Sequence, residues 1–179
     1  MKIINIFIAF FLCIFSFQSC NFTQTEDCKI PVYLPQIQDE NNFTVTSFST
    51  TGQNISQTIN SKNKYVIFEM NKNLATPVLL SNKQNEILYG CIYPYDKELS
   101  AEYSYSSFIL YTALLRVKEE CKDEKEFLEA QEKLSLFNWP RFTEECQKFE
   151  NPFLFDKDLI VEKILSNKFK KTDLKVKKK

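Results

Sequence analysis

The 179-residue sequence contains no histidine, only two glycines and a single tryptophan. The absence of histidine excludes imidazole zinc sites, Ser-His and Cys-His nucleophile pairs, and histidine-based pH switches. The two glycines, Gly52 and Gly90, do not form a phosphate-binding loop, and no GxxxxGK[ST] motif occurs. The sequence therefore indicates no cofactor and no metal site, and paired carboxylates are the remaining candidates for catalysis.

The net charge of zero conceals a separation of charge along the chain. Residues 96–167 contain ten Lys or Arg against sixteen Asp or Glu, whereas residues 168–179 contain seven Lys against Asp173. We interpret residues 168–179 as a basic, solvated tail that makes weak, salt-sensitive contacts with the acidic segment before it. A tail of this charge attracts acidic partners.

The chain begins with a hydrophobic leader. Residues 3–17 are almost entirely apolar, and this run is too short to span a bilayer comfortably. The leader ends in Phe17-Gln18-Ser19-Cys20, so that a small residue directly precedes a cysteine. These features predict an export signal.

The end of the leader resembles the lipobox of bacterial envelope lipoproteins, in which a peptidase cuts before the cysteine and the cysteine is then acylated. The resemblance implies that residues 1–19 are a signal peptide. It also implies that lipidated Cys20 anchors the mature chain to a bacterial membrane, outside the cytoplasm. The alternatives are an ordinary cleaved secretory signal and an uncleaved N-terminal anchor, and both also place the chain outside the cytoplasm.

Four cysteines remain once Cys13 leaves with the leader and Cys20 is assigned to lipidation. In an exported chain, four cysteines predict two disulfides, and three pairings are possible. The four are Cys28, Cys91, Cys121 and Cys146. We favour the pairs Cys28–Cys91 and Cys121–Cys146, because each then stays within one structural half of the chain.

Residues 20–30 are interpreted as the lipidated cysteine and a polar tether, and residues 31–95 as a β-rich unit. Short runs of β-branched and aromatic residues recur there between polar turns, which favours a small sandwich or an open antiparallel sheet. Pro77 predicts an edge strand or a strand that starts after it. Gly90 predicts a bulge or a close backbone approach.

Residues 96–167 predict three or four helices. Residues 108–117 are apolar on nearly all sides, as in a buried helix. Asp123 begins a second helix, Pro140 a third and Asp156 a fourth. The fold class is therefore α+β, with an antiparallel β unit followed by helices.

Two groups of residues are candidate sites. Neighbouring carboxylates at 119–120 and 144–145 are the raw material for an acid–base pair, but we favour a solvated helix surface, because neighbours on one helix do not face each other. Four aromatic residues could form a binding surface, since they combine apolar area with a polar group, or they cover a sheet–helix junction. They are Tyr93, Tyr95, Tyr103 and Trp139.

We expect a lipid-anchored cell-envelope protein with a non-enzymatic binding or structural role. Its expected partners are the membrane, through the anchor, and an envelope or host protein or an acidic polymer, through the lysine-rich tail. Specific nucleic-acid binding is not expected, because the tail has no stacking aromatic beyond Phe169. One alternative is an extracytoplasmic hydrolase that uses carboxylates. The other is a eukaryotic secreted glycoprotein, because N-x-[ST] triplets occur at Asn21, Asn42 and Asn54.

Overall fold

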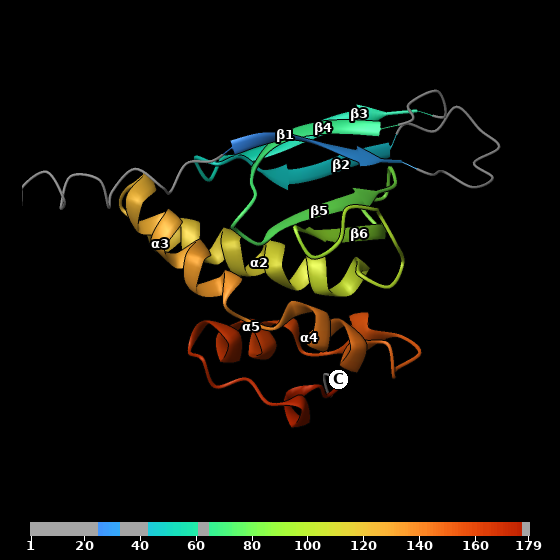
Figure 1. Cartoon of the computed structure of the whole chain (residues 1–179). Helices are drawn as coiled ribbons and strands as arrows, with labels where there is room; N and C mark the ends of the chain where they lie inside the picture. The colour runs from blue at the N-terminus through green and yellow to red at the C-terminus, as the bar shows by residue number, and fades with distance from the viewer. Residues whose placement is uncertain (1–24, 33–42, 61–64, 177–179) are drawn as a thin grey trace, which may run out of the picture.

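The computed structural model describes residues 25–32, 43–60 and 65–176, so the leader and Cys20 lie outside it. The described chain confirms the predicted α+β class, with antiparallel strands followed by helices (Figure 1). The strands are β1 (Thr25–Pro31), β2 (Phe43–Phe48), β3 (Asn54–Ile59), β4 (Tyr65–Asn71), β5 (Thr76–Ser81) and β6 (Ile87–Tyr93). The helices are α2 (Ser104–Glu120), α3 (Glu124–Ser135), α4 (Trp139–Cys146) and α5 (Lys157–Leu165), and the 3₁₀ turns are η1 (Pro152–Leu154) and η2 (Lys171–Asp173).

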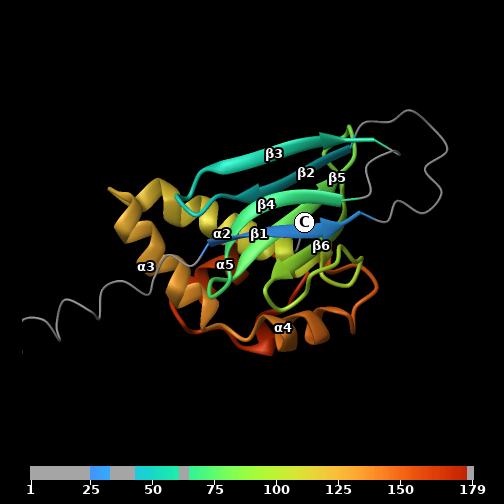
Figure 2. The same ribbon diagram turned by 45° about the horizontal axis from the view of Figure 1, so that its top comes forward.

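The strands form two antiparallel sheets that share one apolar core. One sheet pairs β1 with β4, and the other has the strand order β3-β2-β5-β6. In β4, Val66, Phe68 and Met70 are buried while the residues between them are exposed, as expected of a strand with one face on a core. Side chains from both sheets belong to this core. The arrangement is sandwich-like, and Figure 2 shows the ribbons of the two sheets.

Strand β1 corrects the interpretation of residues 20–30 as a tether for residues 25–30, while residues 20–24 lie outside the described chain. Residues Thr25–Pro31 pair with β4 along their whole length, with Cys28 opposite Phe68. Only Cys28 and Ile30 of this polar segment are buried. Two buried positions are too few to produce a recognisable alternating pattern, and the pairing with β4 becomes visible only in three dimensions.

Two alternatives were predicted for Pro77: its strand lies at a sheet edge, or the strand starts after it. Both are wrong. Strand β5 begins at Thr76 and lies between β2 and β6. The carbonyl of Pro77 accepts a hydrogen bond from Ser47 Oγ at 2.9 Å, so Pro77 turns its backbone polar side toward β2. Since the ladder with β2 reaches only to Leu79, the missing amide of Pro77 removes no sheet hydrogen bond there.

Helix α2 covers the other face of the four-stranded sheet, and Gly90 permits its close approach. A Cβ at Gly90 would lie 2.7 Å from Ser107 Oγ and 3.0 Å from the carbonyl oxygen of Tyr103. This confirms a close backbone approach, whereas the register irregularity of the strand pair lies at Leu80/Ser81. The helix starts at Ser104, earlier than the apolar run indicates.

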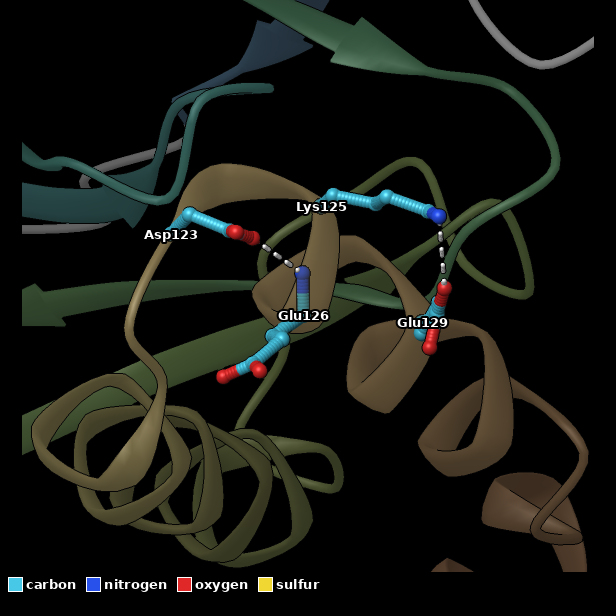
Figure 3. A network of polar contacts seen from close by, with 4 residues as sticks. All are labelled: Asp123, Lys125, Glu126 and Glu129. Atoms are coloured by element: carbon cyan, nitrogen blue, oxygen red, sulfur yellow. Dashed lines mark hydrogen bonds and ion pairs between the residues drawn. The ribbon is translucent and has the colours of Figure 1, made fainter.

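Helix α3 follows its sequence signals closely. Its N-cap Asp123 accepts a hydrogen bond from the amide of Glu126 at 2.9 Å, and Lys125 pairs with Glu129 at 3.9 Å (Figure 3). The carboxylate of Glu126 in turn accepts from the amide of Lys122 at 2.8 Å. The buried face of the helix consists of Phe127, Gln131 and Leu134.

The last two helices close a second core against α2. Pro140 lies in the first turn of α4, as predicted, and Phe142 is buried. The helix ends at Cys146, and Phe149 beyond it is 43% exposed. In α5, the side chain of Asp156 accepts from the amide of Leu159 at 3.3 Å, which confirms the predicted helix start.

The interpretation of residues 168–179 as a solvated tail is wrong for residues 168–176. Phe169 packs against the helical core, and Leu174 is buried within it at 7% exposure. Val176 forms a β-bridge with Phe155, and the Lys175 carbonyl accepts from the amide of Asp156 at 3.1 Å. The lysines are exposed, while Phe169 and Leu174 between them pack against the core. A count of charges in the segment does not reveal this packing. Residues 177–179 lie outside the described chain.

Candidate functional site

The four aromatic candidates do not form one surface. Tyr93 is 2% exposed in the sheet core and donates a hydrogen bond to the Glu26 carboxylate, whereas Trp139 is fully buried in the helical core. Tyr103 is half-buried against that same helical core. Tyr95 is exposed, and its hydroxyl donates to the Ser135 carbonyl at 2.7 Å. These positions favour the alternative in which the residues cover the sheet–helix junction.

All four cysteines of the folded domain are free thiols in the structure. Cys28 and Cys91 belong to the same sheet core, and burial raises the pKa of both thiols. Cys121 follows α2 at the border of the helical core, and burial raises the pKa of Cys146, at the end of α4, to about 12. The two disulfides stay predictions, with Cys28 and Cys91 sharing a core. Cys20 lies outside the described residues.

The carboxylate pairs do not form an acid–base site. Glu119 and Glu120 are neighbours on the exposed last turn of α2, where Arg116 pairs with Glu120 at 3.7 Å. Glu144 is exposed on α4, and Glu145 pairs with Lys148 at 2.7 Å. Hydrolysis of a glycoside requires two carboxyl groups on opposite sides of the scissile bond. Pairs on a single helix do not meet that requirement.

Two hollows lie side by side at the end of α3. One, of about 430 Å³, lies between α2, α3 and α5 and has mostly apolar walls. The other, of about 590 Å³, lies between α3 and the β4–β5 turn, and Glu129 and Glu132 are among its walls. Those two carboxylates come from one helix face, so they do not face each other across a substrate. Lys133 and Leu136 border both hollows, and Leu136 is 87% exposed.

A third hollow lies between α4 and the C-terminal segment, and we call it the tail hollow. Its volume is about 340 Å³. It is lined by Phe137, Asn138, Arg141, Phe142, Glu145, Phe169 and Lys171. Two stretches of chain far apart in sequence thus build it, one from Phe137 to Glu145 along α4 and the other from Phe169 to Lys171.

The floor of the tail hollow is a triangle of phenylalanine rings. Phe137 and Phe142 have ring centroids 5.8 Å apart, and Phe169 lies 5.6 Å from the first and 5.3 Å from the second. All three pairs are edge-to-face, a favourable arrangement of aromatic rings. Phe142 is buried, while Phe137 and Phe169 keep part of their surface open.

The rim of the tail hollow is positively charged. Arg141 and Lys171 line it, and Lys148 lies beside it, paired with Glu145. The hydrogen bond from Lys148 lowers the pKa of the Glu145 carboxyl group, and the charges of Lys148, Lys171 and Arg141 lower it further. The charged residues that line the hollow are Arg141, Lys171 and Glu145, so its lining carries a net charge of +1.

This hollow was not predicted from the sequence. Lys171 and Phe169 belong to the segment interpreted as a solvated tail, and Arg141 lies on a helix that also carries carboxylates. The signal available was the apolar pair Phe169 and Leu174 within a lysine-rich segment. That pair indicates packing of the segment but does not reveal the surface against which it packs.

In the described ranges, no three His, Cys, Asp or Glu side chains are placed to hold a metal ion. No helix of residues 25–32, 43–60 and 65–176 has the length and apolar character needed to cross a membrane. Comparison of the chain with models of protein families, with curated proteins and with solved structures finds no match.

Proposed function

We propose that the protein is a lipid-anchored protein of a bacterial cell envelope, with a non-enzymatic binding role. The observation that carries the proposal is the leader ending in Ser19-Cys20, followed almost at once by a folded domain that begins at Thr25. An acylated Cys20 with two or more chains is sufficient for stable membrane anchoring, because each buried methylene contributes roughly 0.8 kcal/mol.

The position of β1 indicates which end of an anchored domain would be close to the bilayer. Four residues separate Cys20 from Thr25, and a fully extended chain covers roughly 18 Å over that interval. Thr25 pairs with Asn71, which lines the hollow that also contains Leu136. The anchor would therefore hold this end of the domain close to the bilayer. Helix α4 and the C-terminal segment lie on the opposite side of α2 from the sheets (Figure 1).

A binding role is favoured over the two alternatives by particular contacts. A carboxylate-dependent hydrolase requires facing carboxyl groups, and the pairs described above each belong to a single helix. A secreted glycoprotein would carry a glycan on an N-x-[ST] asparagine, but the Asn54 side-chain amide donates to the Tyr111 hydroxyl at 2.7 Å. Asn21 and Asn42 lie outside the described residues. The tail hollow, with its aromatic floor and basic rim, has the features of a binding site.

The anchor is tested by expressing the full chain in a bacterium and separating membranes from soluble fractions. Wild type should be found in the membrane fraction and be extracted only by detergent, whereas Cys20→Ala should be released or keep its leader. Cys13→Ala is the matched control, because Cys13 lies within the leader and should not affect anchoring. If the Cys20→Ala and Cys13→Ala variants had the same membrane distribution and the same N-terminus, the proposal would be contradicted.

A further inference from the structure

We propose that the tail hollow is a binding site for an anionic group carried on a ring, the chemistry shared by aryl phosphates and acidic sugars. The inference names the ligand class for the proposed binding role, and it does not depend on the lipid anchor. It rests on three features of the hollow: its charge, its floor and its size.

The positive charge of the hollow favours an anionic ligand. Arg141 and Lys171 come from different segments and line one hollow, so two positive charges border the same space. The one carboxylate of the rim, Glu145, is already engaged by Lys148 at 2.7 Å. The guanidinium of Arg141 presents planar donors that suit a carboxylate or a phosphate, and hydrogen bonds to such ionised groups are stronger than neutral ones.

The aromatic floor of the hollow favours a ligand that contains a ring. Phe137 and Phe169 each offer partly open aromatic surface beside the two cations. A bare inorganic anion would leave this surface in water, whereas a ring attached to the anion would cover it and gain the hydrophobic contribution. The volume of about 340 Å³ lies at the small end of ligand pockets and suits one ring with one charged substituent.

The walls of the hollow are held in place before any ligand arrives. Asn138 caps α4 by accepting from the amide of Arg141 at 3.1 Å. On the other wall, Asp173 accepts from the amide of Lys170 at 2.8 Å, and buried Leu174 fixes the segment that follows. A preformed site loses little conformational entropy on binding, which favours a small ligand.

The single tryptophan is a built-in reporter for this hollow. The ring of Trp139 lies 4.8 Å from that of Phe137 and 5.8 Å from that of Phe142, between centroids. Because it is fully buried behind the floor, its fluorescence should respond when the floor is covered and should be insensitive to anions elsewhere on the surface.

The test is a fluorescence titration of the detergent-solubilised full chain with phenyl phosphate, inorganic phosphate and phenol. Phenyl phosphate should bind about tenfold more tightly than either fragment, because only it uses both rim and floor. Titrations with glucose 6-phosphate and glucuronate then show whether the ring of the ligand can be a sugar or must be aromatic. Binding of either would extend the site to acidic sugars, and binding of neither would restrict it to aryl anions; each result supports an anion on a ring. Equal affinity for phenyl phosphate and inorganic phosphate, or no saturable signal, would overturn the proposal.

Variants locate the binding. Arg141→Ala and Lys171→Ala should each weaken phenyl phosphate binding by about tenfold, with the far-ultraviolet circular dichroism spectrum unchanged, since both side chains are exposed. Lys168→Ala removes an equally exposed positive charge of the same segment that does not line the hollow, and it should bind as wild type. An equal loss in all three variants would mean non-specific attraction to the basic segment and would refute the site. Membrane fractionation reports the anchor separately, so the two proposals fail independently.

Discussion

Replacing Leu174 by alanine should lower the free energy of unfolding by about 2 to 3 kcal/mol, because it removes a buried side chain from the helical core. Its exposure of 7% places it at the edge of that core, so the cost belongs at the lower end of the range for buried leucines. For a chain of this size, each kcal/mol corresponds to about 2 to 4 °C in Tm, which predicts a decrease of about 4 to 12 °C.

The matched control for this prediction is Lys175→Ala, the next residue along. The Lys175 side chain is exposed, and its backbone carbonyl, which accepts from the amide of Asp156, is retained in the variant. Its free energy of unfolding should stay within about 0.5 kcal/mol of wild type. Thermal and urea unfolding followed by circular dichroism measure both variants. If Leu174→Ala were as stable as Lys175→Ala, the C-terminal segment would not be part of the core, and the tail hollow would lose one wall.

Three further predictions concern other parts of the domain. Gly90→Ala should destabilise the protein by about 1 to 3 kcal/mol in urea unfolding, because the added Cβ would lie 2.7 Å from a hydroxyl oxygen of α2. Asp123→Ala should cost about 1 kcal/mol through the lost N-cap, whereas Lys125→Ala in the same turn removes only an exposed ion pair and should change stability by less than about 0.5 kcal/mol. In protein purified from an oxidising compartment, non-reducing peptide mapping should find Cys28 linked to Cys91, as their shared core suggests.

Each of these three has a result that counts against it. An unchanged Gly90→Ala variant would mean that α2 can move away from the sheet at no cost. Equal losses in Asp123→Ala and Lys125→Ala would assign the effect to surface charge and not to the cap. Cys28 linked to Cys121, or Cys28 found as a free thiol after export, would contradict the proposed pairing.

Local signals in the sequence predicted the elements whose pattern is complete within one segment. The cap of α3 at Asp123 depends only on neighbours in the chain, and it agrees with the structure. Gly90 was also predictable, because a glycine inside a strand indicates a bulge or a close approach.

The sequence did not reveal features that depend on pairing between distant segments. Strand β1 has only Cys28 and Ile30 as buried positions, and its structure depends on β4, which lies more than 30 residues away. Pro77 was misjudged because the point at which the β2 ladder ends follows from the sheet and not from the residues around the proline.

The same reason explains why the tail hollow was missed. Its cations, Arg141 and Lys171, are 30 residues apart, and the contact of Phe169 with Phe137 and Phe142 brings the two segments together. A charge count over residues 168–179 treats the lysines as one group and gives no weight to the two apolar residues among them. The burial of Leu174 depends on a surface that other helices provide.

Mass spectrometry of the N-terminal peptide from detergent-extracted protein tests the central claim most directly. If the protein is a lipid-anchored envelope protein, the peptide should begin at Cys20 and carry the added mass of two or three acyl chains. The Cys20→Ala variant should yield no acylated peptide. A mature N-terminus at any other residue, or an unmodified Cys20 at the terminus, would contradict the account.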